Sequence, residues 1–331
     1  MTCGKRIHTI VLALAVIVSL AFFSCQRRDL YRVVEKLVYL DLDIDTTVLH
    51  GKAEMPEIMV AAFYAAETGN LVSYEFVGPE GGWLHNVSPG KYEMMVYNFN
   101  TSSTIVTDER NFNTALAYTD VAEKNHLISG NKYIGPVIYM PDHLYVSRKA
   151  VDLIYDPISD TVLYHCGDEP KIDSIMSIYH NCVSIMDTYH FIARVKKGLS
   201  YISSAEVYIT GHSKNNLFGP DIRSKEEAVI HFPVYPNVKG NSLEADFVTF
   251  GAIPEKVNTV YLEINATYKT TIPYKYAVDV TDQFARNKEN GYYIIIDPGI
   301  EIDPGSGDKG GLHPSIDDWS EIEKDLPVPQ E

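Results

Sequence analysis

The sequence predicts an all-β protein made of antiparallel β-sandwiches, on three observations. Residues 38–45 alternate strictly between apolar and acidic side chains, the period of two that is typical of a half-buried strand. Many short apolar segments follow, separated by turn residues such as those at 67–70, 78–82 and 88–90. Tyrosine is abundant, with 23 residues, and it favours pleated, half-buried surfaces. Helical heptads and alternating strand–helix patterns are absent from the sequence, which disfavours an α/β fold.

The predicted strands fall into two series. In the first strand, 38–45, the apolar face is formed by Leu40, Leu42 and Ile44. The rest of the first series is 57–65, 71–77, 92–99, 151–155 and 161–165. The second series is 189–195, 205–210, 228–232, 243–250, 257–267, 274–280 and 292–297. A short helix is expected within 281–291, with Thr281 as a candidate N-cap and Gly291 as a candidate stop.

Two tandem domains are expected from these two series. The predicted boundaries are an N-terminal sandwich over 25–160, a linker over 161–184 and a C-terminal sandwich over 185–300. Residues 301–331 form a Gly-, Pro- and acid-rich tail. The chain length of 331 residues agrees with two domains of ordinary size.

The N-terminus predicts a lipoprotein signal peptide over residues 1–24. Lys5 and Arg6 precede an apolar run that ends at Ser24, and Cys25 follows this small residue. Cleavage there would make Cys25 the first residue and let its thiol carry acyl chains, palmitate among them. The apolar run is short for a membrane span, which needs about 20 residues. The alternatives are an ordinary signal peptide with a chance cysteine, or an uncleaved anchor helix.

The charge balance disfavours a role on nucleic acid. The formal net charge is −16, and no basic stripe interrupts it. Such a chain repels the phosphate backbone. The acidic composition is compatible with folded domains that lie outside a membrane, but it identifies no substrate.

Of the four cysteines, Cys3 lies in the predicted signal peptide and Cys25 would carry lipid, which leaves Cys166 and Cys182. In an oxidising compartment they are a candidate disulfide, and the alternative is two buried or distant thiols. Together with His165 and His180 they also offer zinc ligands. The adjacent His165 and Cys166 make an awkward geometry, however, so zinc is disfavoured.

We expect no metal, no cofactor and no enzymatic activity. Asp41, Asp43 and Asp45 resemble the start of a calcium loop, but Thr46 and Lys52 occupy the positions where an EF-hand needs Gly and Glu. A solvated acidic face is the simpler interpretation. The sequence contains no Gly-x-Ser-x-Gly, His-Glu-x-x-His or P-loop motif.

Several segments together resemble the fimbrillin-like lipoproteins of the Bacteroides type. They are Cys25-Gln-Arg-Arg-Asp-Leu-Tyr31 after the signal, the acidic strand at 40–45, Ser88-Pro-Gly-Lys-Tyr92, and the Gly-rich tail that ends near Trp319. The chain is most similar to an uncharacterised branch related to fimbrial anchor and accessory proteins. The resemblance implies two transthyretin-like sandwich domains and a role as anchor, tip or accessory subunit of a surface fimbria.

Three sites match the Bacteroides-type O-glycosylation pattern, in which Ser or Thr follows Asp and precedes an apolar residue or Thr. The acceptors are Thr46, Thr161 and Ser174. Thr46 is the strongest of the three because it follows a strand whose polar face is exposed.

The preferred hypothesis is a lipid-anchored structural or accessory subunit of a fimbria-like surface assembly, with a role in adhesion. Its partners would be fimbrillin-like subunits, joined by strand addition through 33–45, and the outer membrane, in its periplasmic or surface-facing leaflet. The resemblance implies that a polymerising subunit exposes a protease site, often at arginine, after its first strand. No arginine lies between Arg32 and Arg110, which favours an anchor or accessory subunit that is not cleaved there. The alternative is a surface glycan-binding lipoprotein of a nutrient-uptake system, in which Trp83 or Trp319 would stack on sugars.

Overall fold

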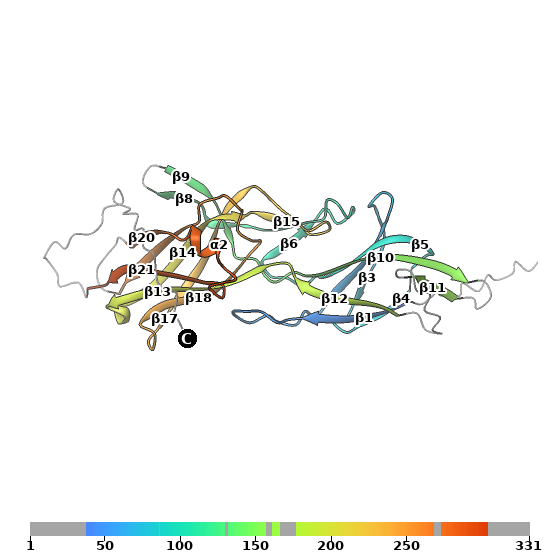
Figure 1. Ribbon diagram of the computed structural model, residues 1–331, viewed down its shortest axis with the longest axis horizontal. Coiled ribbons are helices and arrows are strands. Elements are labelled where there is room, and N and C mark those ends of the chain that lie inside the picture. Colours follow the sequence, from blue (N-terminus) through green and yellow to red (C-terminus); the bar gives the residue numbers. More distant parts are fainter. Residues whose placement is uncertain are drawn as a thin grey trace, which may run out of the picture. The chain divides into compact units, whose positions relative to one another are not determined.

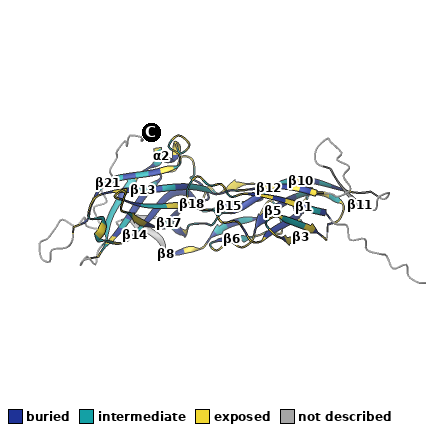
Figure 2. Cartoon of the chain, turned by 90° about the horizontal axis from the view of Figure 1, so that it is seen from below, coloured by how far each residue is buried: buried dark blue, intermediate teal, exposed yellow. Residues whose placement is uncertain are grey.

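The computed structural model describes residues 38–85, 87–129, 132–156, 161–165, 177–267 and 273–303, all of which belong to one compact unit. These residues form three sheets (Figure 1), and the prediction of an all-β fold is confirmed. Figure 2 shows that buried residues concentrate within the strands of these sheets.

The first sheet contains eight strands and curls so that its two ends meet. Its order is β3 (Leu71–Val77), β2 (Met59–Ala65), β5 (Gly90–Asn98), β10 (Tyr145–Asp156), β12 (Ser177–Ser184), β1 (Val38–Asp45) and β4 (Gly81–Leu84), and β11 (Thr161–His165) pairs with β10. The end strands β3 and β4 are consecutive in the chain and are joined by a bridge between Gly78 and Gly81. A first apolar core fills the inside of this curl.

Strand β1 has the bounds and the inward face that its alternation predicts. Val38, Leu40, Leu42 and Ile44 are buried, and the aspartates between them are exposed. The strand lies between β12, which it pairs in parallel, and the short strand β4. Gly81 makes that second pairing possible: its φ is +94°, and an added Cβ would lie 1.9 Å from the Leu40 carbonyl oxygen.

Strand β2 is apolar along its whole length because both of its faces are buried. Phe63 points into the first core, and its neighbours Ala62 and Tyr64 join a second apolar cluster on the opposite face. Strand β5 behaves in the same way, with Met94 in the first core and Met95 in the second cluster. Both strands therefore act as a middle layer.

A four-stranded sheet contributes to this second cluster. Its order is β16 (Ile222–Arg223), β15 (Asn215–Leu217), β7 (Leu116–Thr119) and β6 (Thr104–Thr107). Ala115 just before β7 and Ala117 within it join the cluster with Phe218 after β15 and Phe250 after β18. Residues from both halves of the sequence thus share one apolar cluster.

The second large sheet encloses the third apolar core. Its order is β20 (Tyr274–Asp279), β19 (Thr259–Ala266), β14 (Ile202–Ser213), β17 (Glu227–Asn237), β18 (Ser242–Thr249), β13 (Asp187–Lys197) and β21 (Tyr293–Glu301); β9 (Lys132–Tyr139) pairs with β17 and with β8 (Val121–Ser129). A 3-10 turn, η1 (Leu199–Tyr201), joins β13 to β14. Phe232 and Phe247 stack at 4.6 Å between ring centroids, and Tyr189 stacks on Phe247 at 5.1 Å. These three aromatic rings therefore pack in the core of the sheet.

Three features differ from the expectations. The sheets are mixed, because β1–β12, β13–β21 and β9–β17 are parallel pairs. Residues 177–184, expected in the linker, form β12, and residues of the predicted N-terminal domain, in β9, pair with β17. The domain boundaries themselves stay a prediction.

The helix α2 (Thr281–Ala285) is shorter than expected, and Thr281 is its first residue instead of its N-cap. The Thr281 hydroxyl donates to Asp279 Oδ1 at 2.6 Å, and its oxygen accepts from the Asn258 amide at 3.0 Å. The side chain therefore ties the helix start to the neighbouring strands instead of capping the helix. The residues after Ala285 form turns.

The inward face of β1 gives a direct test of the first core. Leu40→Ala should lower the free energy of unfolding by about 2–5 kcal/mol, because it leaves a cavity at a fully buried position. Asp41→Ala, on the exposed face of the same strand, should change it by less than about 0.5 kcal/mol. Urea unfolding followed by circular dichroism measures both, and equal costs would contradict the assigned register.

Candidate functional site

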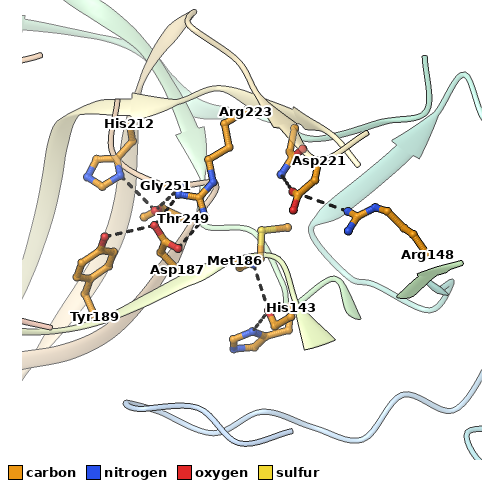
Figure 3. Close-up of polar contacts among 12 residues, drawn as sticks. His143, Arg148, Met186, Asp187, Tyr189, His212, Asp221, Arg223, Thr249 and Gly251 are labelled. Atoms are coloured by element: carbon orange, nitrogen blue, oxygen red, sulfur yellow. Dashed lines mark hydrogen bonds and ion pairs between the residues drawn. The ribbon is translucent and has the colours of Figure 1, made fainter. Parts of the chain in front are cut away.

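A polar site lies where the chain passes from β12 to β13. A cavity of about 530 Å³ opens there. It is lined by Arg148, Val183, Ser184, Ile185, Met186, Asp187, Asp221, Ile222 and Arg223. These residues come from β10, from the β12–β13 connection and from the segment around β16, and Figure 3 shows how the polar ones face one another.

Arg223 and Asp187 form the tightest ion pair of the site (Figure 3). Nη1 of Arg223 donates to Asp187 Oδ2 at 2.9 Å, and Nη2 donates to Oδ1 at 2.8 Å. Burial would lower the pKa of Arg223, but the hydrogen bonds and charge of Asp187 raise it above its ordinary value. The guanidinium lies over Gly251, whose φ is +105° and where an added Cβ would come within 2.0 Å of Nη1. This position therefore requires glycine.

Arg148 connects β10 to the segment after β15. Its Nε donates to the Phe218 carbonyl at 2.8 Å, and its Nη2 lies 3.7 Å from Asp221 Oδ1. Burial lowers the pKa of Arg148, and the charge of Asp221 opposes this. Asp221 also accepts from Asn216 Nδ2 at 3.3 Å, which orients its carboxylate.

The β12–β13 connection is held by backbone and side-chain hydrogen bonds. The Ile185 amide donates to the Leu144 carbonyl at 3.0 Å, and Ser184 Oγ accepts from the Met186 amide at 3.3 Å. Ser184 also hydrogen-bonds His143 Nδ1 at 2.9 Å. Ile185 and Met186 themselves are buried in the second apolar cluster. The connection is therefore packed into the fold.

His212 is fully buried behind the Arg223–Asp187 pair. Its Nδ1 is 3.2 Å from Thr249 Oγ1, which in turn accepts from the Gly251 amide at 2.9 Å. The ring packs against Phe284 at 4.9 Å between centroids. Burial, with a smaller contribution from Arg223, lowers the pKa of His212 to about 3. His212 is thus neutral in the folded protein near pH 7.

The chemistry of this arrangement is that of a structural joint. Each of the four charged groups that line the cavity is paired with another, Arg148 with Asp221 and Arg223 with Asp187. A nucleophile or general base would need a poised group that is free to react. None of these four residues was predicted, since single charged residues in separate segments carry no local pattern.

The residues predicted from the sequence do not gather at this cavity. Thr46 follows β1 and is partly buried, and the glycosylation of all three predicted acceptors stays a prediction. Thr161 begins β11, but its side chain lies outside the described residues, as does Ser174. Cys25, which carries the predicted lipid, also lies outside them.

The predicted partners Cys166 and Cys182 cannot be compared directly, because Cys166 lies outside the described residues. Cys182 points into the first core, and burial, with a smaller contribution from Asp43, raises the pKa of its thiol to about 12. His180, two residues earlier on the same face, hydrogen-bonds Ser147 Oγ at 3.0 Å. Burial, with a smaller contribution from Lys149, lowers the pKa of His180 to about 4. The disulfide stays a prediction.

Within the described residues, no helix is long and apolar enough to cross a membrane.

Comparison with known families decides the classification. Residues 24–233 match the family described as "Domain of unknown function (DUF5119)". The chain belongs to this family. The match includes the first sheet, the β12–β13 connection and part of the second sheet, so it spans all four charged residues of the cavity.

A curated relative of this DUF5119 chain is the "Putative fimbrium anchoring subunit Fim4B" of Bacteroides ovatus. The two are 26% identical over 239 residues, which are 70% of this chain. The chain spans 62% of the length of that relative. The resemblance to fimbrial anchor and accessory proteins is therefore confirmed.

Two crystal structures share the fold. One is described as "a putative adhesin" of Bacteroides ovatus. The two structures align over 92% of this chain and 98% of the adhesin chain, with a TM-score of 0.54 and 23% identity. The other, described as "putative polysaccharide binding proteins (DUF1812)" of Bacteroides thetaiotaomicron, covers 80% of this chain and 92% of its own, with a TM-score of 0.50 and 10% identity. At these identities the likeness shows the fold alone.

A double-mutant cycle tests the joint. Arg223→Ala and Asp187→Ala should each destabilise the protein, with a coupling energy of about 1–3 kcal/mol, because the pair is bidentate and partly buried. The exposed pair Lys214–Glu226, joined at 3.2 Å, is the matched control and should couple by about 0–1 kcal/mol. Equal coupling energies in the two cycles would show that the Arg223–Asp187 pair is no stronger than an exposed ion pair, which would contradict its role in the joint.

The buried histidines predict acid destabilisation. An unfolded histidine binds a proton below about pH 6.5, whereas folded His212 does so only near pH 3, so stability is lost as pH falls between these values. The slope from one such residue reaches about 1.4 kcal/mol per pH unit. His212→Phe keeps a ring against Phe284 and should flatten the decline in Tm between pH 7 and 4.5. His85→Phe, at an exposed position, should leave the slope unchanged; a His212→Phe slope equal to that of the wild type would contradict the assignment.

Proposed function

We propose that this chain is a lipid-anchored structural or accessory subunit of a fimbria-like cell-surface assembly, with a role in adhesion and no enzymatic activity. The observation that carries the proposal is the relative named as a fimbrium anchoring subunit, which aligns with 70% of the chain. The proposed location is the outer membrane, in its periplasmic or surface-facing leaflet. The proposed anchor is acylated Cys25 at the end of a signal peptide over residues 1–24.

The fold is consistent with a role in which the subunit bears mechanical load. The proposal includes two transthyretin-like domains in tandem, and the two large sheets with their own cores agree with that arrangement. The β12–β13 connection is buried and flanked by ion pairs, so a pull on one sheet would be passed on to the other.

The proposed anchor precedes the start of β1 in the chain. Cys25 precedes Val38 by 13 residues, and a fully extended segment of this length reaches at most about 45 Å. The first sheet would therefore stay near the membrane surface. We place the strand-addition surface here too, because β4 pairs only with 38–41. Within the described part of the chain, residues 43–45 of β1 pair with β12 alone, which leaves main-chain groups on their other side for a partner strand.

A glycan-binding role is the second candidate, favoured by three exposed aromatic side chains, two in β3 and one directly after β5. Tyr74, Phe76 and Phe99 are each just over half exposed, at 54%, 55% and 53%. Neighbouring rings meet edge to face, however, at interplanar angles of 90° and 69°. They do not form one flat platform for a sugar chain, so this candidate ranks second.

The test is a comparison of wild type and Cys25→Ala in intact cells, each tagged after Glu331. After crosslinking and pull-down, wild type should recover fimbrillin-like subunits, and Cys25→Ala should lose both these subunits and labelling by a palmitate analogue. Cys3→Ala, in the segment that is removed, is the matched control and should behave as wild type.

Recovery of a transporter and glycan-binding proteins in place of fimbrial subunits would overturn the proposal. A glycan-array titration of the same protein then supports the second candidate if selective binding is lost in Phe76→Ala.

A further inference from the structure

A group of potential metal ligands lies on the outer face of the second sheet, away from the cavity at the β12–β13 connection. His190 in β13 and Asp246 in β18 are directly paired across the two strands. His50 reaches them from the loop between β1 and β2. One ring nitrogen of each histidine and one carboxylate oxygen of Asp246 lie within 4.8 Å of one another. Ligands from three distant segments thus converge.

Both histidines are already oriented as metal-binding histidines are. Nε2 of His50 lies 2.6 Å from the Gly291 carbonyl oxygen, and Nδ1 of His190 lies 2.6 Å from Asp246 Oδ1. The Gly291 carbonyl can accept a hydrogen bond from Nε2 of His50, which turns Nδ1 of that ring toward an ion. Nδ1 of His190 and Oδ1 of Asp246 lie side by side, as two ligands of one ion would. A hydrogen bond from the second nitrogen to a carbonyl or carboxylate is the usual support of a metal-bound histidine.

Glu244 gives His190 an outer partner of the same kind. Its Oε2 lies 3.7 Å from Nε2 of His190, the ring nitrogen that points away from Asp246. The two oxygens of Glu244 also accept hydrogen bonds from Asn237 and Ser242, which hold the carboxylate in place. Glu244 therefore supports the ring of His190 from the side opposite the ion.

The surroundings hold these side chains in place. The ring of Tyr293, in β21, packs edge-on against His50 at 4.5 Å and against His190 at 5.5 Å between centroids. The loop backbone at Gly51 lies against Asp246, since an atom added there would meet its Cβ at 3.2 Å. The side chains of His190 and Asp246 are 21% and 44% exposed, so an ion could reach them from solvent.

We propose that His50, His190 and Asp246 bind a divalent ion of the zinc class, with Glu244 supporting His190. Two imidazoles and one carboxylate suit Zn²⁺ or Co²⁺ better than Ca²⁺ or Mg²⁺, which take oxygen ligands. The ion ties the loop after β1 to β13 and β18. It therefore links the strand nearest the proposed lipid anchor to the second sheet. The site has no motif in the sequence, where no metal was expected, because its residues lie far apart in the chain.

The test uses the full-length chain purified in detergent, stripped with EDTA and dialysed. Calorimetric titration with ZnCl₂ should show one site per chain, and Zn²⁺ should raise the Tm. Co²⁺ should give the intense visible bands of tetrahedral coordination. His50→Gln and His190→Gln should each weaken Zn²⁺ affinity by about tenfold or more, and the loop position of His50 keeps at least one variant folded.

His231→Gln is the matched control. His231 lies in β17, and its Nε2 is 3.5 Å from the carboxylate of Glu206, but it does not belong to the His50, His190 and Asp246 group. It should bind Zn²⁺ as the wild type does. Absence of binding by the wild type, or equal weakening in all three variants, overturns the proposal. Ca²⁺ in place of Zn²⁺ should leave the Tm unchanged; an equal rise would overturn the assignment to the zinc class.

Discussion

Strands β2 and β5 are apolar on both faces, and this places two separate demands on the rest of the chain. One face is covered when the first sheet curls and brings β1, β10 and β12 over it. The other face is covered by Ala117 in β7, by Phe218 after β15 and by Phe250 after β18. Burial of apolar surface stabilises by roughly 25 cal/mol per Å². Because the covering residues come from both halves of the sequence, the first sheet cannot complete its packing without segments that follow residue 185.

The polar contacts around the cavity follow from that apolar packing. Bringing Phe218 onto the first sheet also brings its carbonyl and the nearby Asp221 toward Arg148 on β10. Buried polar groups must find partners, since an unpaired one costs about 1–3 kcal/mol. The Arg223–Asp187 pair and the bond from Arg148 Nε to the Phe218 carbonyl satisfy this need at the edge of the cluster, while Arg148 Nη2 faces Asp221 at 3.7 Å without a hydrogen bond. Ion pairs of this kind add little net stability, but they select one arrangement of the connected segments. The apolar cluster therefore supplies the stability of the joint, and the ion pairs define its geometry.

The sequence predicts the parts of this fold that depend on local periodicity, and misses those that depend on distant partners. The strands 38–45, 71–77 and 161–165 have the predicted bounds, because one strand's alternation is visible within the strand itself. Strand β12 was missed because its inward residues include His180 and Cys182, while Tyr179 and Val183 face solvent and are nearly half exposed. Strands β6, β7, β15 and β16 have four residues or fewer, too short for a periodic pattern. The cavity and the histidine cluster each draw on segments far apart in the chain, so no motif announces them.

The parallel pairs, which local patterns could not predict, suit the proposed anchor best. Tension from the proposed lipid at Cys25 would reach the fold at the start of β1, and β12 leads onward into β13. Because β1 and β12 are parallel, pulling the start of one and the end of the other slides the strands along each other. The pairs from Tyr39 to Asp45 then carry the load together. The pair β13–β21 repeats this geometry, since the chain arrives at the start of β13 and leaves at the end of β21. An antiparallel hairpin such as β2–β3, pulled at its two free ends, would instead open one pair at a time.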